Sequence, residues 1–350
     1  MSLHIDHRNP GIHWIDDRGQ RTPGHYGDPA AERAALASGC ALIDLSHGGV
    51  VALAGAERMS FLSGLITNQI KEVSPERSLY AALLSPQGRF LWDFTLVALG
   101  EELLLVTEPA RVAALVERLH MYKLRAKITI TDASQRFGLL AVAGPAAGAA
   151  MAAAFPGQIT AEAAPGATRA PAGEVRLWRD PRHPAFGWRL LAPAAELDAY
   201  WSRLGERIPP AGFLAWEDHR IGHALPRGGA DLIPEQTLPL EAGFLELNGV
   251  SFTKGCYVGQ ETTARTHHRG TLKQRLHQVS FPPGAALSCG LTVTTRGGGK
   301  EVGTLTSLSP QADRGLGLAI LRRSDVTGGA ALEANGVALA AHKPDWATWE

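Results

Sequence analysis

The chain has 350 residues and a mass of 37.2 kDa, a size that favours two or three domains. Its 34 Lys and Arg balance its 34 Asp and Glu, so a protein whose whole surface binds nucleic acid is excluded. The 45% apolar and 19% charged fractions also exclude wholesale disorder. Three cysteines without a Cys-x-x-Cys pair exclude a disulfide-dense secreted domain and an all-cysteine zinc site.

The N-terminal segment and the longest apolar runs bear on location. No apolar run reaches the roughly 18–20 residues that cross a bilayer, so we expect no membrane contact. Residues 1–28 are polar and lack the apolar core of a secretory signal. We therefore expect a soluble cytoplasmic protein that does not bind nucleic acid directly.

The first part of the chain alternates between helical and strand patterns. Pro29 and Gly39 bracket a short helix, and Ser85-Pro-Gln-Gly88 predicts a hairpin turn. Helices are expected at 29–39, 56–66 and 109–120, and strands at 49–53, 79–84, 90–98, 103–107 and 127–131. This order predicts a largely antiparallel sheet with helices on one face.

The rest of the chain predicts a second α+β unit and then a region of short strands. The second unit has strands at 137–142, 174–179 and 188–191, an Ala-rich helix after Pro145, and helices at 195–205 and 212–224. Strands at 275–281, 301–308, 316–321 and 330–341 predict a small antiparallel barrel or sandwich. The expected domains are residues 1–135, 136–270 and 271–350.

The segment from 251 to 270 carries the strongest chemical pattern. Cys256 lies between Gly255 and Gly259, and glycines permit close approach of the backbone to a ligand. In an extended segment Lys254 shares a face with Cys256, and an ammonium favours the reactive thiolate. We therefore expect Cys256 to be a reactive thiol that Lys254 activates; the alternative is a small buried hydrophobic side chain. Cys40 and Cys289 lack this context and are expected to be structural.

Two histidines in the same segment raise the question of metal binding. Adjacent residues of a strand point in opposite directions, and no third ligand lies near His267 and His268. No stable metal site is therefore expected, although Cys256 could serve as a transient ligand of iron or of a cluster. Arg265, Arg269 and Lys273 make the segment locally basic, which suits an anionic ligand.

Several motifs together identify a family. Lys254-Gly-Cys-Tyr-Val-Gly-Gln-Glu261 resembles the K-G-C-[YF]-x-G-Q-E signature of YgfZ-type proteins, a branch of the superfamily of the glycine-cleavage T-protein (GcvT). Its continuation, Ala264-Arg-Thr-His-His-Arg-Gly270, resembles the mitochondrial iron–sulfur assembly factor of that branch. Further matches are Phe61-Leu-Ser-Gly-Leu-Ile-Thr-Asn68, Ser85-Pro-Gln-Gly-Arg89 with Asp93, Tyr122-Lys-Leu-Arg-Ala-Lys127, Leu238-Pro-Leu-Glu241 and Gly315-Leu-Gly-Leu-Ala319.

The resemblance implies a fold and a function. The expected fold is an α+β, GcvT-like ring of three domains, two α+β domains and a C-terminal antiparallel β-barrel, around a folate-sized channel. The expected function is a tetrahydrofolate-binding accessory protein for assembly or repair of iron–sulfur clusters, with iron–sulfur client or assembly proteins as partners, tRNA-modifying enzymes among them. Folate contacts are expected from Trp216, Asp93, Arg265, Arg269, Tyr257, Gln260 and Glu261.

The sequence also departs from the T-protein. Its R-x-E-x-G segment corresponds here to Arg220-Ile-Gly-His-Ala-Leu-Pro226, where Gly222 replaces the glutamate, and its G-Y-T-G-E-D motif has no counterpart. Glycine-cleavage aminomethyl transfer is therefore not expected. The alternatives are a folate-dependent one-carbon transferase, with Asp93 as the acidic group, and a folate-sensing interaction module without chemistry.

Overall fold

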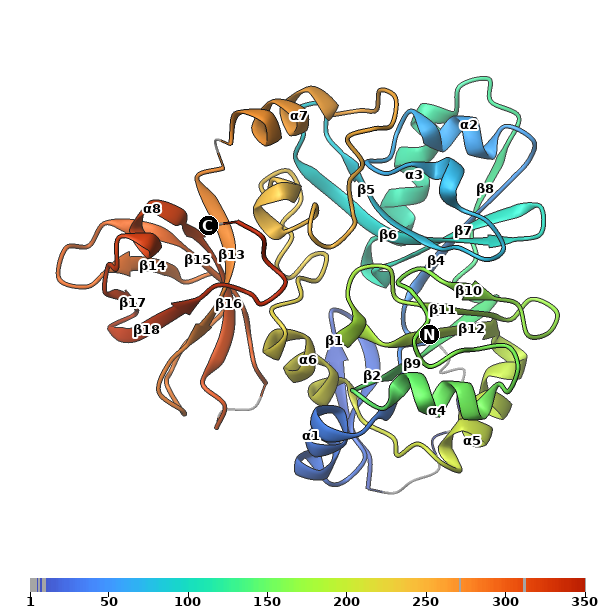
Figure 1. The fold of residues 1–350 in the computed structure, drawn as a ribbon, viewed down its shortest axis with the longest axis horizontal. Helices are drawn as coiled ribbons and strands as arrows, with labels where there is room; N and C mark the ends of the chain where they lie inside the picture. The colour runs from blue at the N-terminus through green and yellow to red at the C-terminus, as the bar shows by residue number, and fades with distance from the viewer. Residues whose placement is uncertain (1–4, 6, 8–10, 271, 311–312, 350) are drawn as a thin grey trace. The chain divides into compact units, whose positions relative to one another are not determined.

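The computed structural model describes residues 5, 7, 11–270, 272–310 and 313–349, with the side chain of Arg269 excepted (Figure 1). By the density of their internal contacts these residues form two compact units. Unit 1 comprises residues 1–82, 92–216 and 248–257, and unit 2 comprises 83–91, 217–247 and 258–350. Among the described residues no helix is long and apolar enough to cross a membrane.

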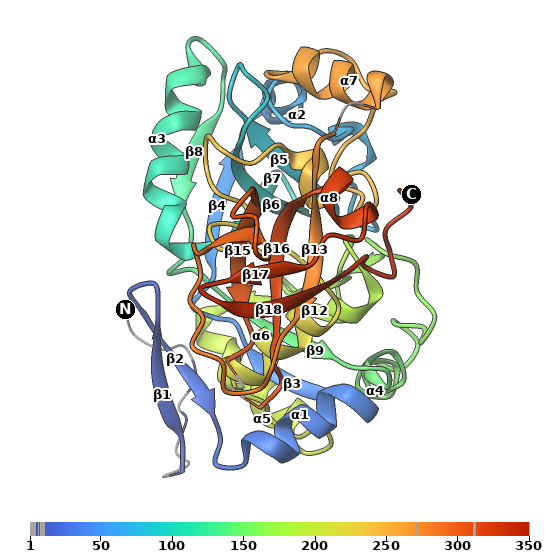
Figure 2. The same cartoon turned by 90° about the vertical axis from the view of Figure 1, so that its left-hand side faces the viewer.

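The first five-stranded sheet has the order β5-β6-β7-β4-β8. Its elements are β4 (Gly49–Ala54), α2 (Arg58–Ser63), β5 (Leu79–Leu84), β6 (Phe90–Leu99), β7 (Glu102–Thr107), α3 (Val112–Lys123) and β8 (Thr129–Asp132). The β4–β7, β4–β8 and β6–β7 pairs are antiparallel, and α3 packs on β8 and β4 (Figure 2). Residues of β5 and β6 are nearly all buried, as their continuous apolar runs predict.

The second five-stranded sheet repeats this layered arrangement in the order β10-β11-β12-β9-β3. It contains β3 (Ala41–Asp44), β9 (Phe137–Ala143), α4 (Ala147–Ala154), β10 (Thr168–Arg169), β11 (Arg176–Arg179), β12 (Trp188–Pro193) and α5 (Leu197–Gly205). Strand β3 precedes the first sheet in sequence but pairs with β9 of the second. The core of this layer is built from side chains such as Leu140, Met151 and Trp188.

The N-terminal region contains a helix that was expected and a hairpin that was not. Helix α1 (Pro29–Ser38) begins where the Asp28 carboxylate accepts hydrogen bonds from the backbone amides of Ala30 and Ala31 at 3.1 and 3.0 Å. Strands β1 (His13–Asp17) and β2 (Gln20–His25) pair around a turn at Arg18 and Gly19, both with positive φ. Short 3₁₀ turns complete the chain at η1 (Ile70–Glu72), η2 (Pro109–Arg111), η3 (Pro184–Phe186), η4 (Ala194–Glu196) and η5 (Pro239–Ala242).

The C-terminal region is a closed antiparallel barrel of order β13-β16-β15-β14-β17-β18. Its strands are β13 (Gln274–Ser280), β14 (Thr292–Thr295), β15 (Glu301–Leu308), β16 (Leu316–Arg322), β17 (Leu332–Ala334) and β18 (Val337–His342), with α8 (Arg323–Thr327) after β16. The single strand expected at 330–341 is wrong. Asn335 and Gly336, both with positive φ, form a tight hairpin turn that divides it into β17 and β18. The predicted α+β class with a C-terminal barrel is confirmed.

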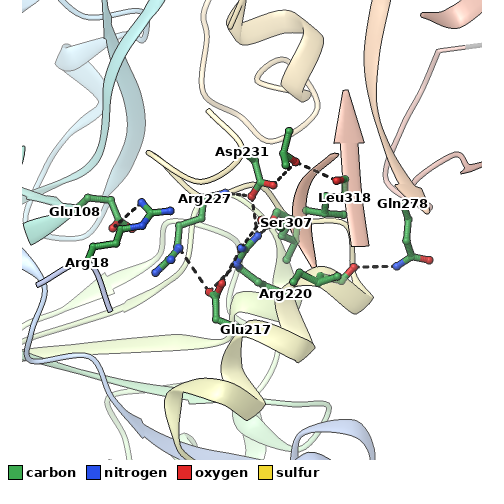
Figure 3. A network of polar contacts seen from close by, with 12 residues as sticks. Arg18, Glu108, Glu217, Arg220, Arg227, Asp231, Gln278, Ser307 and Leu318 are labelled. Carbon is green, nitrogen blue, oxygen red and sulfur yellow. Dashed lines mark hydrogen bonds and ion pairs between the residues drawn. The ribbon is translucent and has the colours of Figure 1, made fainter. Parts of the chain in front are cut away.

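A buried arginine organises unit 2. Helix α6 (Phe213–Gly222) carries Arg220, whose side chain is 1% exposed. Its guanidinium donates to both oxygens of Glu217 at 2.7 and 2.8 Å and to Asp231 at 2.8 Å (Figure 3). It also donates to the carbonyl oxygen of Leu225 at 3.0 Å and to the hydroxyl of Ser307 on β15 at 2.9 Å. The cation thus links α6, the following loop and the barrel.

We expect Arg220→Met to lower the free energy of unfolding by about 3–5 kcal/mol, because the carboxylate of Asp231, which has no exposed surface, would lose its cation. The matched control is Arg77→Met, which removes an exposed ion pair to Glu72 at 3.2 Å and should cost less than about 1 kcal/mol. Urea denaturation measures both values. Equal losses for the two variants would contradict the organising role of Arg220.

Candidate functional site

Cys256 lies exposed on a loop whose preceding lysine is buried. The ammonium of Lys254 donates to the carbonyl oxygens of Ser63 at 2.9 Å and Ile66 at 2.5 Å, at the end of α2. A thiol at the surface is available to a partner, and the buried lysine fixes the backbone two residues before it. The alternative reading of Cys256 as a buried hydrophobic side chain does not match its exposure.

Further bonds attach the same loop to the segment that follows α2. The Thr67 hydroxyl donates to the carbonyl of Gly249 at 2.6 Å, and the backbone amide of Ser251 donates to the carbonyl of Thr67 at 3.0 Å. The Asn68 amide donates to the carbonyl of Asn248 at 2.7 Å. The 61–68 segment therefore supports residues 248–254, and Lys254 links it to the start of the 254–261 segment.

Burial has a consequence for the charge of Lys254. It lowers the pKa of Lys254 to about 8, so the side chain remains mostly protonated at neutral pH. The ammonium also lies 4.8 Å from the ring centroid of the buried Tyr257. These contacts direct the lysine to backbone carbonyls and an aromatic ring. Activation of Cys256 by Lys254 stays a prediction.

A close backbone contact closes the loop at its C-terminal end. Gly259 has φ of +83°, and a Cβ there would lie 2.5 Å from the carbonyl oxygen of Ser85. A Cβ on Gly88 would lie 2.8 Å from Cβ of Thr262. Only glycine fits both positions, so the 85–88 turn packs directly on the start of helix α7 (Gln260–Arg269). By contrast, Gly255 has open space around its missing Cβ.

The segment after Gly259 forms helix α7, whereas the sequence analysis treated its two histidines as residues of an extended strand. It runs between Gly259 and Gly270, both in the left-handed conformation. The rings of His267 and His268 lie 5.3 Å apart on this helix. Four of the expected folate-binding residues lie on it: Gln260 is its first residue and Arg269 its last, and Glu261 and Arg265 are exposed, with Arg265 at 4.0 Å from Glu261. The side chain of Arg269 lies outside the described residues.

Asp93 on β6 belongs to a buried polar cluster in unit 1. Its carboxyl accepts a hydrogen bond from the Tyr80 hydroxyl at 2.9 Å. Burial raises the pKa of the Asp93 carboxyl, although the Arg182 guanidinium opposes the change. Arg182 in turn donates to both oxygens of the buried Asp180 at 3.0 and 2.8 Å. The Arg182 guanidinium also lies 5.3 Å from the centroid of Tyr80.

Trp216 extends the same cluster with aromatic surface. It is 4% exposed, and its ring lies 5.5 Å from that of Phe186. The Arg189 guanidinium lies 4.8 Å from the Trp216 centroid and 3.2 Å from Asp180, and burial lowers the pKa of Arg189 to about 10. The structure therefore connects Asp93 with Trp216 through side chains that the sequence analysis did not select. The sequence signal that could have found these side chains is the charged Asp180-Pro-Arg182 segment between two predicted strands.

The residues that could hold a metal ion do not gather. In the ranges that the structure describes, no group of three or more His, Cys, Asp or Glu side chains has the arrangement of a metal site. Cys256 and Cys289 are exposed thiols of the described residues, and Cys256 is the one in the 254–261 segment. It can supply one ligand to a metal or cluster that another molecule also holds.

Comparison with known proteins defines the class. Residues 3–247 match the family model of the GCVT N-terminal domain, and residues 273–349 match the CAF17 C-terminal β-barrel domain. The glycine cleavage system aminomethyltransferase T from Bartonella henselae has the same fold, with a TM-score of 0.83 over 97% of this chain and 96% of its own, at 20% identity. The fold is thus that of the GcvT superfamily.

Sequence relatives narrow this further. The chain is 34% identical to the mitochondrial iron–sulfur cluster assembly factor IBA57 of Mus musculus, over 85% of this chain and 82% of the relative. The Homo sapiens protein of the same name is 35% identical over 83% and 81%. The chain belongs to this GcvT-related family of iron–sulfur cluster assembly factors. The predicted relationship to the iron–sulfur branch of the superfamily is confirmed.

The same relatives contradict the expected cytoplasmic location, because they are mitochondrial proteins. The expectation rested on the polar composition of residues 1–28 and on the lack of a long apolar run. Those features do not distinguish one aqueous compartment from another.

Gly259→Ala should lower the free energy of unfolding by about 1–3 kcal/mol, because an L-residue is strained at φ of +83° and its Cβ would collide with the Ser85 carbonyl. Gly255→Ala is the matched control, one residue before Cys256, and should change stability by less than about 0.5 kcal/mol. Thermal unfolding followed by circular dichroism compares them. A more harmful change at Gly255 would contradict the packing described here.

Cys256 should react with iodoacetamide at pH 7 faster than Cys40 or Cys289. Cys256 and Cys289 are both exposed, but partial burial of the thiol raises the pKa values of Cys40 and Cys289 and so reduces their thiolate fractions. Lys254→Met should shift the pH midpoint of Cys256 labelling upward if the ammonium acts on the thiol. Peptide mass spectrometry across pH reads each site. Slowest labelling at Cys256, or a midpoint that ignores Lys254→Met, would contradict the pairing.

Proposed function

We propose that this protein is a tetrahydrofolate-binding accessory protein for the assembly or repair of iron–sulfur clusters in client enzymes. The observation that carries the proposal is the exposed Cys256 on a loop fixed by the buried Lys254. The relatives named as iron–sulfur cluster assembly factors support this reading of the thiol. The signature at 254–261 further supports a position close to the YgfZ-type folate-binding proteins.

The thiol would act as a shared, transient ligand. Iron–sulfur clusters are normally held by several thiolates, and Cys256 offers one. The cluster is cargo, so the remaining ligands come from the partner that delivers or receives it. A rigid loop suits this role, because the thiol is presented without the loss of backbone freedom that ordering a mobile loop would cost.

The Asp93 cluster fits the chemistry of a folate. A pterin ring offers N–H donors and a flat face, and the cluster offers a carboxyl at Asp93 and aromatic faces at Trp216 and Phe186. Folate bound to the chain would supply a one-carbon carrier or a regulatory signal. The residues of the chain bind and orient it.

Aminomethyl transfer is not part of the proposal. The glutamate that the T-protein has in its R-x-E-x-G segment is Gly222 here, and packing does not require this glycine. The nearest atom to a Cβ at Gly222 would be Nη2 of Arg314 at 3.7 Å. A carboxylate could be accommodated at this position, but the sequence does not supply one. Iron–sulfur enzymes that modify tRNA are the first client class to assay.

Deleting the gene in its host should lower the activity of a panel of iron–sulfur enzymes, tRNA-modifying ones included. Wild-type protein should restore it, and Cys256→Ala should not, since the shared ligand is lost. Cys289→Ala is the control, also exposed, and should restore activity fully. Full rescue by Cys256→Ala would remove the thiol from the mechanism and favour a sensing module without chemistry.

Folate binding is measured separately by calorimetric titration with tetrahydrofolate. Asp93→Asn keeps the volume of the side chain and should weaken binding at least about tenfold, since one charge-assisted hydrogen bond is lost. Asp132→Asn on the exposed end of β8 serves as the control. No heat at millimolar tetrahydrofolate would contradict folate binding and leave the cluster role to stand on Cys256 alone.

A further inference from the structure

The barrel in unit 2 has a pocket that the proposed function does not use. It has a volume of about 490 Å³ and lies where α8 follows β16, beside the start of β13. Its lining consists of Leu272, Lys273, Arg322, Arg323, Ser324 and Thr327. None of these residues belongs to the Cys256 loop or to the Asp93 cluster. The volume falls within the range of small-molecule sites, about 300–1,000 Å³.

The lining is strongly cationic. Three of the six side chains carry a positive charge and none carries a negative one. The neighbouring carboxylate, Asp325, is engaged by Lys300 and lies 3.7 Å from Arg322. In the part of the chain that the structure describes, neither Lys273 nor Arg323 forms an ion pair.

The backbone holds these cations in register. Gln274 pairs with Arg322 across the β13–β16 ladder, and the backbone amide of Arg323 donates to the carbonyl of Lys273 at 2.8 Å. The Thr327 hydroxyl donates to the carbonyl of Arg323 at 3.0 Å. Like charges brought together on a fixed frame repel one another, and an anion in the pocket would offset that repulsion. The Ser324 hydroxyl adds an exposed hydrogen-bonding group.

We propose that this pocket binds a small multivalent oxyanion, either a phosphate-bearing compound or a polycarboxylate. Guanidinium groups pair with both through parallel N–H donors, and the Lys273 ammonium adds a point charge. Leu272 supplies one apolar contact for the body of the ligand. The site would give the barrel a ligand of its own, separate from the folate and the cluster.

The test is isothermal titration of the full chain with pyrophosphate and with citrate at about 50 mM NaCl, where surface charges are weakly screened. Lys273→Gln and Arg323→Gln should each weaken the tighter probe at least about tenfold, as loss of one charge-assisted contact predicts. Neither side chain has an ion-pair partner among the described residues, and each substitution relieves repulsion, so the melting temperature without ligand should not fall. The control is Arg296→Gln, an exposed barrel arginine 4.0 Å from Glu333.

The outcomes separate the sources of the anion. Tighter pyrophosphate supports a phosphate-bearing ligand, and tighter citrate supports a polycarboxylate. Absence of heat with both probes at millimolar concentration would overturn the proposal. Equal weakening by Arg296→Gln would also overturn it, because it would show diffuse attraction to a basic surface.

Discussion

Unit 2 depends on one buried cation. Arg220 is enclosed by Glu217, Asp231 and Ser307, which come from a helix, a loop and a barrel strand. A guanidinium removed from water is tolerated only when carboxylates and carbonyls replace its hydration. Through its bond to Arg220, each partner therefore fixes the segment that carries it. The Thr306 hydroxyl extends the network by donating to Asp231. Within this unit the β-barrel is attached by more than the chain connection, because the charged side chain of Arg220 joins strand β15 to helix α6.

The Cys256 loop shows that the residues of one short signature have different structural roles. Lys254 is turned inward to two carbonyls, Gly259 permits close contact with the 85–88 turn, and the cysteine between them faces solvent. The buried Lys254 and the closely packed Gly259 thus fix the chain on either side of the exposed cysteine. A lysine near a thiol can activate the thiol or hold the backbone in place. The contacts of Lys254 account for the second role.

Local signals predicted well the elements that depend on local physics. Pro29 and Gly39 predicted the first helix, and apolar runs predicted β5 and β6. The pattern of short strands predicted the barrel, although the Asn335-Gly336 turn was overlooked. Contacts between distant segments were not predictable in this way. The approach of Arg182 to the ring of Tyr80, and the joining of β3 to the second sheet, arise from tertiary packing that leaves no periodic trace in the sequence. The polar 260–269 stretch lacked an apolar face, which is why its helix was missed.

Closure of the barrel limits how another protein can be recognised by it. Strand β13 pairs with both β16 and β18, so the ring of hydrogen bonds from β13 to β18 is complete. A sheet with a free edge can accept an extended peptide as an additional strand, but a closed ring has no free strand edge to which a peptide could add. A client or assembly partner that docks on this barrel must therefore be recognised by side chains, either those of the loops or those of the short helix α8. Such recognition is specific to the shapes and charges displayed, and sequence changes in the loops could retarget it while the strands remain unchanged.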